Sequence, residues 1–336
     1  MTNTSSVWSD VNLDREGRSF GYIRVPHSIN DSGYGWIPVP IIALKNGAGP
    51  TVLMMAGNHG DEYEGQVLLM KLAQNLSPEQ VRGRLIILPG VNAPAVAAGT
   101  RISPFDDGNL NRLFPGDPEG TPTQMIAHFI DSVLLPQVRY CFDFHSGGYS
   151  SEYIPAAHLV APDDADLRAE AIGFLKAFAM PNSILIEGLI GGGKRLLGSC
   201  RRLGVGHMST ELGGAGAFSI QAYRAAEKGL PRLLRHVGVL ADTEQDTPPK
   251  TRFFVRQPMR DFVYAQATGV FEAYVGLGER VEAGMPAGAV HFTETPWRAP
   301  HPVAFMSSGV VLCKRSPARV KIGDCLFVTG TPVAEA

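Results

Sequence analysis

The sequence predicts an α/β fold: a mostly parallel or mixed, twisted sheet with helices on both faces, followed by a small C-terminal all-β domain. In the larger, N-terminal part of the chain, short apolar runs alternate with helix-like segments, as in chains that build βαβ units. A polar, proline-rich segment at 242–250 is typical of a linker. Beyond it, short runs are separated by glycine turns and show no helical period. We therefore predict one domain over residues 1–245 and a second, a β barrel or sandwich, over 250–336.

The composition is that of a soluble globular protein and argues against several functional classes. Hydrophobic residues make up 44% of the 336 residues, and the net charge of −2 gives no electrostatic basis for binding nucleic acid. Every apolar stretch falls short of the ~20 residues of a membrane-spanning helix, and the first residues lack a signal-peptide pattern. The four cysteines have no C-x-x-C spacing, which indicates free thiols in a reducing, cytoplasmic compartment. The composition is compatible with a homo-oligomer as well as a monomer.

The first part of the chain predicts a βαβ unit. Apolar runs at 51–56 and 84–89 indicate buried strands, and the segment 66–76 between them indicates a helix. Units of this kind pair their strands in parallel through a right-handed crossover. A further strand is predicted at 36–44, where two prolines lack ladder donors and favour an edge position.

The segment Gly57–Gly65, between the first strand and the helix of this unit, is where we expect the site to be built. His59 and Glu62 lie three residues apart on the turn, so an imidazole and a carboxylate can converge outside the carboxyl end of the strand. A catalytic zinc site uses three such protein ligands plus a water. Because a lone H-x-x-E also occurs by chance, the hypothesis requires a third ligand, a histidine at another strand end.

Two later strands end in matching residues. An apolar strand at 139–144 runs into glycines, with His145 at its carboxyl end as the predicted third ligand. Asp143 faces the same side of that strand and can accept a hydrogen bond from His59 or His145, or else cap the strand end. The strand that follows Val205 ends at Glu211, again before glycines. Glu211 is either a general base near the metal or an ordinary solvated or paired carboxylate.

A long stretch at 90–122 has little periodicity, and loops of this length inside a compact domain are functional or disordered. It holds Arg101, Asn111 and Arg112 among turn-forming residues. An arginine fork grips carboxylates in a bidentate way, but two arginines on a solvated loop are the simpler alternative.

The remaining segments complete the predicted first domain. We predict strands at 156–160 and 183–187, and helices at 123–138, 164–178 and 217–237. The stretch 189–199, with glycines at 191–193, predicts a mobile loop, for which a plain turn is favoured over a lid.

Four motifs that occur in order carry a resemblance to a known family. They are His59-Gly60-Asp61-Glu62, Asn111-Arg112-x-Phe114-Pro115-Gly116, Asp143-x-His145-Ser146-Gly147-Gly148 and Thr210-Glu211-Leu212-Gly213-Gly214. Each motif alone is weak, but the ordered set resembles the succinylglutamate desuccinylase/aspartoacylase family, which is related to zinc carboxypeptidases. The resemblance covers roughly residues 50–330. The wider context, with Gly99-Thr100-Arg101 and Gly108-Asn109-Leu110-Asn111-Arg112, resembles one branch more closely, the N-acetyl-diaminobutyrate deacetylases of ectoine breakdown.

This resemblance implies a zinc-dependent amide hydrolase. It implies that His59, Glu62 and His145 hold one Zn²⁺ per chain with one open position, and that Glu211 moves the proton of the attacking water to the leaving amine. Asp143 would support a histidine ligand from behind.

The same resemblance implies the substrate contacts. Arg101 would polarise the amide oxygen, while Asn111 and Arg112 would grip the α-carboxylate of a small N-acyl amino acid. The products would be a carboxylate, acetate in the favoured branch, and a free amino acid.

Other functions are weighed beside this one. A deacylase of the succinylglutamate or acetylaspartate type is the alternative within the family. A metallocarboxypeptidase would need an open peptide groove, against which the C-terminal β domain argues if it overhangs the site. A non-catalytic sugar- or amino-acid-binding protein would be favoured by loss of a ligand or of Glu211, and all four residues are present.

Overall fold

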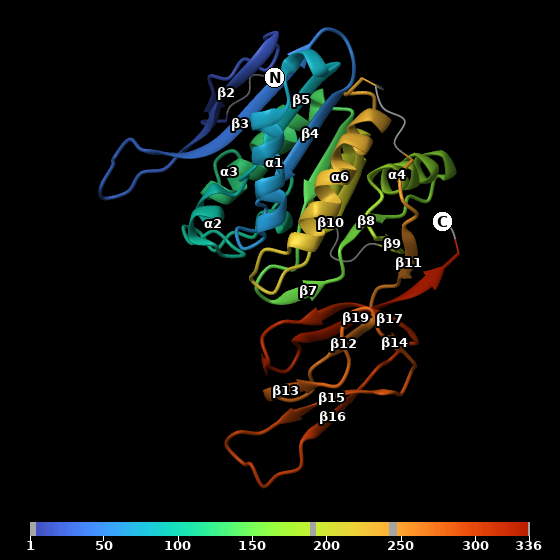
Figure 1. Cartoon of the computed structure of the whole chain (residues 1–336). Helices are drawn as coiled ribbons and strands as arrows, with labels where there is room; N and C mark the ends of the chain where they lie inside the picture. The colour runs from blue at the N-terminus through green and yellow to red at the C-terminus, as the bar shows by residue number, and fades with distance from the viewer. Residues whose placement is uncertain (1–4, 189–192, 242–246, 335–336) are drawn as a thin grey trace.

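A large mixed sheet crosses the molecule, and a second, smaller sheet lies at its C-terminal end (Figure 1). The structure is a computed structural model that describes residues 5–188, 193–241 and 247–334. The path of the large sheet is β1 (Trp8–Ser9), β2 (Gly17–Pro26), β3 (Trp36–Asn46), β5 (Gly83–Leu88), β4 (Thr51–Ala56), β6 (Tyr140–Phe144), β10 (Gly206–Glu211), β8 (Ala156–Val160), β9 (Asn182–Ile186), β11 (Arg252–Arg256), β19 (Cys325–Val333), β17 (Gly309–Arg315) and β14 (Arg280–Val281).

The smaller, antiparallel sheet holds β16 (His301–Ala304), β15 (Pro286–His291), β13 (Gly269–Ala273) and β18 (Arg319–Val320). Two short strands attach beside the large-sheet path, β12 (Phe262–Tyr264) on β19 and β7 (Ser151–Tyr153) on β17. The predicted all-β character of the C-terminal region is confirmed. β11 belongs to the same region but pairs in parallel with β9, so the large sheet continues past the predicted linker, of which residues 242–246 lie outside the described part. The division into two domains at 245 and 250 stays a prediction.

Helices cover both faces of the large sheet, as predicted. One face carries α1 (Tyr63–Asn75), α4 (Ala165–Phe178) and α6 (Ile220–His236), whose buried side chains form one core with the sheet (Figure 1). The other carries α2 (Ala93–Ala98), α3 (Pro122–Phe129) and α5 (Leu196–Leu203), which pack on a second core. Burial of apolar side chains in these two layers is the main force that fixes the sheet between the helices. Within the described residues, no helix is long and apolar enough to cross a membrane.

The central strands run in parallel. β5, β4, β6 and β10 are neighbours with parallel pairing throughout, which confirms the predicted βαβ unit of β4, α1 and β5. Since parallel strands end at one edge, the residues that follow β4, β6 and β10 meet there. β8 then pairs antiparallel with β10.

The prediction of an edge strand at 36–44 is wrong. β3 lies between β2 and β5. Its two prolines, Pro38 and Pro40, pair only with β2, and the ladder to β5 begins at Ile42. The missing N–H groups therefore shorten only the ladder between β3 and β5, and β3 still lies inside the sheet.

The helix predicted at 123–138 is present as a continuous helical segment, in which α3 ends at Phe129 and passes directly into a π turn and a 3-10 turn. Two loop predictions need correction. The loop at 90–122 contains the short helix α2 and a 3-10 turn at Leu110–Arg112. Of the loop predicted at 189–199, residues 189–192 lie outside the described part, and the chain is already helical from Leu196.

One close contact brings the first turn of α1 against β6. A Cβ on Gly65 would lie 2.6 Å from Phe144 Cβ and 2.8 Å from the Phe144 carbonyl oxygen. Only a glycine lets the helix lie this close to the strand, and the approach sets Glu62, just before α1, beside His145, just after β6.

Gly65→Ala should therefore lower the free energy of unfolding by about 1–3 kcal/mol through overpacking. The control is Gln74→Ala on the exposed side of the same helix, which should stay within about 0.5 kcal/mol of the wild type. Urea unfolding followed by circular dichroism measures both. Equal stability of the two variants would contradict the close packing of α1 on β6.

Candidate active site

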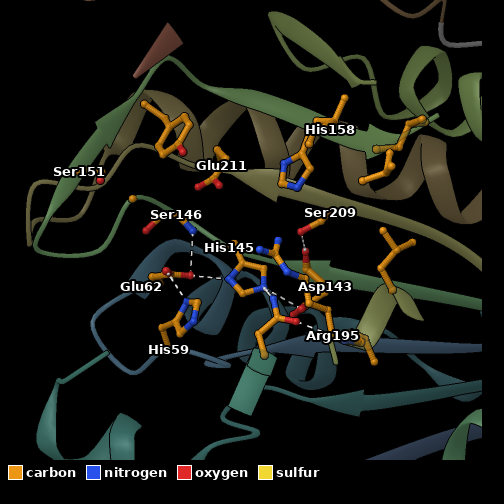
Figure 2. Close-up of a pocket in the computed structure, with 18 of the residues that line it drawn as sticks. His59, Glu62, Asp143, His145, Ser146, Ser151, His158, Arg195, Ser209 and Glu211 are labelled. Carbon is orange, nitrogen blue, oxygen red and sulfur yellow. Dashed lines mark hydrogen bonds and ion pairs between the residues drawn. The ribbon is translucent and has the colours of Figure 1, made fainter. Parts of the chain in front are cut away.

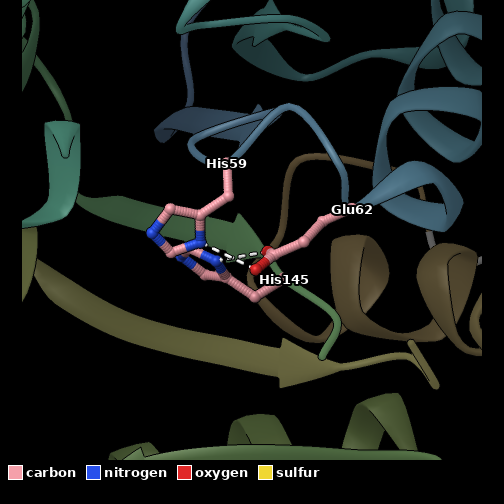
Figure 3. A group of neighbouring side chains, drawn as sticks. All are labelled: His59, Glu62 and His145. Atoms are coloured by element: carbon pink, nitrogen blue, oxygen red, sulfur yellow. Dashed lines mark hydrogen bonds and ion pairs between the residues drawn. The ribbon is translucent and has the colours of Figure 1, made fainter. Parts of the chain in front are cut away.

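Three side chains converge where β4 and β6 end. His59 Nδ1 donates to Glu62 Oε1 at 2.7 Å, and His145 Nδ1 donates to Glu62 Oε2 at 2.7 Å (Figure 3). All three residues are buried, and one ligand atom from each lies within 4.8 Å of the others. Two imidazole nitrogens and a carboxylate oxygen form a donor set that can hold a metal ion. The structure thus brings together the three residues that the sequence analysis singled out as ligands.

The outer nitrogens of both imidazoles have partners of their own. His145 Nε2 donates to Asp143 Oδ2 at 2.7 Å, and Asn58 Nδ2 donates to the same oxygen at 3.2 Å. His59 Nε2 lies 3.2 Å from Asn109 Oδ1. Asp143 therefore supports His145 rather than His59, and both rings are held with Nδ1 toward Glu62.

The charges of the cluster favour a cation at its centre. Burial alone would raise the pKa of the Glu62 carboxyl, but the charges of His59 and His145 and their hydrogen bonds hold it well below its usual range. Burial opposes the proton on His145, yet Asp143 and Glu62 raise the pKa of this imidazole well above its ordinary value. The anionic carboxylates thus stabilise positive charge between them, as a metal site requires.

The predicted substrate-binding residues lie around the cluster. Arg101 Nη1 is 3.5 Å from Glu62 Oε1, so its guanidinium reaches the cluster from the loop. Asn111 Nδ2 is 3.5 Å from His145 Nε2. Arg112 is exposed and lines the same pocket, and its Nη1 donates to the Asn111 carbonyl at 2.8 Å.

Glu211 also lines this pocket, and the pKa of its carboxyl is shifted in the opposite direction from that of Glu62 (Figure 2). Its Oε2 is buried without a hydrogen-bond partner in the described part of the chain. Burial, and then the negative charge of Glu62, raise the pKa of the Glu211 carboxyl to about 8. Two neighbouring carboxyls with pKa values pushed in opposite directions are typical of catalytic sites.

The pocket extends from this cluster over β10 and β8 and has a volume of about 400 Å³. His207, Ser209 and Glu211 are alternate residues of β10, and all three line the pocket. His158 on β8 lies opposite Ser209 in the antiparallel ladder and also lines the pocket (Figure 2). Burial lowers the pKa of His158 well below its ordinary value and that of His207 to about 4. Both imidazoles are therefore neutral.

Sequence reasoning missed several residues of this pocket. His207 and Ser209 could have been found from the two-residue period that ends at Glu211. Arg195, before α5, and Arg256, at the end of β11, also line the pocket, but the sequence carries no local signal for either. Their positions depend on how α5 and β11 pack on the sheet.

Comparison with known proteins agrees with this geometry. The model of the succinylglutamate desuccinylase/aspartoacylase catalytic domain matches residues 48–237. The chain belongs to this family. It is 36% identical over 326 residues to the N-alpha-acetyl-L-2,4-diaminobutyric acid deacetylase of Halomonas elongata, which covers 96% of this chain and 94% of that protein. The family and this relative place the chain among amide-hydrolysing deacylases.

Solved structures of relatives share the whole fold. A succinylglutamate desuccinylase/aspartoacylase of Rhodobacter sphaeroides aligns with a TM-score of 0.91 and 39% identity, over 98% of this chain and 100% of that chain. The ectoine utilization protein EutE (DoeB) of Ruegeria pomeroyi, solved with product bound, aligns with a TM-score of 0.93 and 36% identity, over 97% and 99%. The similarity spans the catalytic region and the C-terminal sheet alike.

Metal analysis tests the ligand set. The wild type should hold one divalent ion per chain after dialysis, and His59→Ala should hold none, because the site loses a third of its donors. The control His207→Gln changes a half-buried histidine that lines the same pocket outside the cluster, and it should keep the ion. A folded His59→Ala protein that retained one tightly bound metal would show the assignment to be wrong.

The raised pKa of Glu211 gives a pH-dependent stability in the metal-free protein. Below about pH 4.5 the carboxyl is protonated in both the folded and unfolded states. As the pH rises to about 8 the unfolded state ionises first, so the wild type loses stability, by about 1.4 kcal/mol for each pH unit between the two pKa values. Glu211→Gln lacks this loss, so its stability relative to the wild type should rise between about pH 5 and 8. A difference that stays constant over this range, in urea titrations, would contradict the raised pKa.

Proposed function

We propose that the protein hydrolyses the amide bond of Nα-acetyl-L-2,4-diaminobutyrate with one bound Zn²⁺, releasing acetate and the free amino acid. The observation that carries the proposal is the convergence of His59, Glu62 and His145 in one pocket with Glu211, whose carboxyl has a pKa raised by burial. The similarity to the Halomonas elongata deacetylase over nearly the full chain supports the acetyl-diaminobutyrate substrate.

Zinc is the metal that fits the donor set best. Two imidazole nitrogens and one carboxylate, with a position left for water, are typical of catalytic zinc, whereas magnesium and calcium prefer oxygen ligands. When bound, zinc would lower the pKa of a water toward ~7 and polarise the substrate carbonyl. Glu62 and the two histidines would hold it, with Asp143 fixing the His145 ring.

Glu211 is the proposed proton carrier. Its Oε2 has no hydrogen-bond partner among the described residues, so it is free to accept a proton from the attacking water. A cation in the cluster would oppose the charge of Glu62 and bring the carboxyl into its ionised form. The same group would then donate the proton to the leaving amine.

Arg101 and the pair Asn111–Arg112 are the proposed substrate contacts. Arg101 reaches the cluster and would stabilise the negative charge that develops on the amide oxygen. Asn111, whose Nδ2 lies 3.5 Å from His145 Nε2, and Arg112 both line the pocket and would hold the α-carboxylate. We place the reaction in the cytoplasm, in line with four cysteines that are all free thiols.

A second candidate is favoured by one observation. Arg195 and Arg256 add two guanidinium groups to the pocket, beyond Arg101 and Arg112. This surplus of positive charge would suit an N-acyl amino acid with a second carboxylate, such as an acetylaspartate or succinylglutamate type.

An assay of carboxylate and amine release decides between the two. Zinc-loaded protein should release acetate from Nα-acetyl-L-2,4-diaminobutyrate with a higher kcat/KM than from N-acetylaspartate, and should release little succinate from N-succinylglutamate. The metal-free protein is the control. Preference for a dicarboxylic substrate would select the second candidate, and failure on all substrates would sink the proposal.

Glu211→Gln keeps the size of the side chain but cannot take a proton. It should lower kcat by about 10²–10⁴-fold while zinc content stays at one per chain. Glu170→Gln, a carboxyl paired with Arg139 on the surface, is the control and should leave kcat unchanged. An unaltered kcat in Glu211→Gln would remove this residue from the mechanism.

A further inference from the structure

Glu64 is an acidic residue that the structure buries completely, outside the cluster of metal-binding side chains. It lies in the first turn of α1, two residues after Glu62, and is 0% exposed. The Ser219 N–H donates to its Oε1 at 2.6 Å, whereas its Oε2 has no hydrogen-bond partner in the described part of the chain. An apolar side chain would fill this space without the cost of burying a carboxyl, so the bond to Ser219 is the feature to explain.

The partner of Glu64 stands at the end of the turn that follows Glu211. Gly213 and Gly214 open this turn with φ of +99° and +130°, and Ser219 ends it as the N-cap of α6. The two ends of the turn meet, since a Cβ on Gly213 would lie 2.7 Å from Ser219 Cβ and 3.5 Å from Glu64 Oε1. Glu64 therefore lies where the turn closes on itself.

Glu211 is the last residue of β10, where the sheet holds the strand less firmly. The parallel ladder with β6 ends at Ser209, although the Leu212 N–H still donates to the His145 carbonyl at 3.0 Å. On the other side, Glu211 pairs with Ala156 of β8. The two glycines that follow restrain the backbone less than any other residue would. The end of β10 thus depends on how the turn beyond it is anchored.

The bond between Ser219 and Glu64 joins two helices that start at the site. α1 begins directly after the proposed ligand Glu62, and α6 begins directly after the turn that follows Glu211. The two helices lie side by side on one face of the sheet (Figure 1). A hydrogen bond between their first residues therefore fixes the place of Glu62 relative to the end of β10.

We propose that Glu64 is a positioning residue for Glu211: by accepting the Ser219 N–H, it holds the end of β10 where the Glu211 carboxyl can move a proton beside the metal site. The proposal rests on the function proposed above, in which Glu211 carries the proton. A side chain that only stabilised the helix N-termini would change the stability of the protein and leave the rate of the folded enzyme alone. The two roles therefore give different results.

Two substitutions at Glu64 separate its acceptor oxygen from its volume. Glu64→Gln keeps an oxygen that can accept the Ser219 N–H, whereas Glu64→Leu fills nearly the same space without an acceptor. Zinc-loaded Glu64→Leu should lose about ten- to hundredfold in kcat with KM nearly unchanged, because a misplaced catalytic group slows the chemical step. Glu64→Gln should keep most of the wild-type kcat. Loss of zinc from folded Glu64→Leu would overturn the proposal, since Glu64 would then act on the cluster.

A double-mutant cycle shows whether the effect passes through Glu211. In Glu211→Gln, where the proton carrier is already lost, Glu64→Leu should reduce kcat little further. Losses that multiply would contradict the proposal. The matched control is Asp131→Leu, which removes a buried carboxyl that pairs with Arg202 outside the pocket. It should lower stability and leave the kcat of the folded enzyme unchanged.

A pair of variants at the donor gives the same test without changing α1. Ser219→Pro removes the donating N–H, and the φ of −84° at this position is close to that of proline. Ser219→Ala keeps the N–H and removes only the hydroxyl that accepts from the Ala222 N–H. Ser219→Pro should lose kcat as Glu64→Leu does, and Ser219→Ala should lose much less. Equal kcat in the two Ser219 variants would refute the role of this bond.

Hydrogen–deuterium exchange separates this proposal from the proposed function, because it needs no turnover. Peptides that cover residues 212–219 should exchange about tenfold faster or more in zinc-loaded Glu64→Leu than in the wild type, and Glu64→Gln should resemble the wild type. Unchanged exchange in Glu64→Leu would overturn the proposal whatever the activity. Faster exchange in a protein that hydrolyses no N-acyl amino acid would support the anchoring by Glu64 and contradict the proposed function alone.

Discussion

The bridge from the Glu62 carboxylate to two imidazoles is the interaction on which the site depends. Each oxygen of Glu62 accepts from one Nδ1 atom, so the two rings share a single anion. Asp143 holds His145 from behind, and without it that ring could turn. Because the three groups are buried, their charges act in a medium of low dielectric, where an unpaired charge is costly. The cluster is thus preorganised to receive a cation.

The sheet order makes this bridge possible. β4 and β6 are neighbours in parallel, and β10 follows on the other side of β6, so three strand ends meet at one edge. The close packing of α1 on β6 at Gly65 then places Glu62 beside His145. The pocket continues from the cluster of His59, Glu62 and His145 along β10 and is also lined by residues of α5 and β11. Residues from distant elements of the fold therefore meet in a single pocket.

The sequence was enough to predict where the candidate site residues lie, because each stands at or just after the end of a strand that runs into a turn. His59 and His145 follow apolar strands, and Glu211 ends a more polar strand shortly before two glycines. The position of β3 inside the sheet was not predictable from its prolines. The part of β3 that holds them pairs with β2 alone, and only the part from Ile42 onward also pairs with β5. Arg195 and Arg256 are long-range features: their side chains meet the pocket only after α5 and β11 have packed, and no spacing in the sequence encodes that.

X-ray absorption spectroscopy of the zinc-loaded protein tests the central claim most directly, because it reports the atoms bound to the metal. The account predicts a first shell of nitrogen and oxygen at about 2.0–2.2 Å, with the outer-shell scattering of two imidazole rings and none from sulfur. A ligand at about 2.3 Å, the distance of a thiolate, or the scattering of fewer than two imidazoles would contradict the assignment of His59, Glu62 and His145 as the metal site.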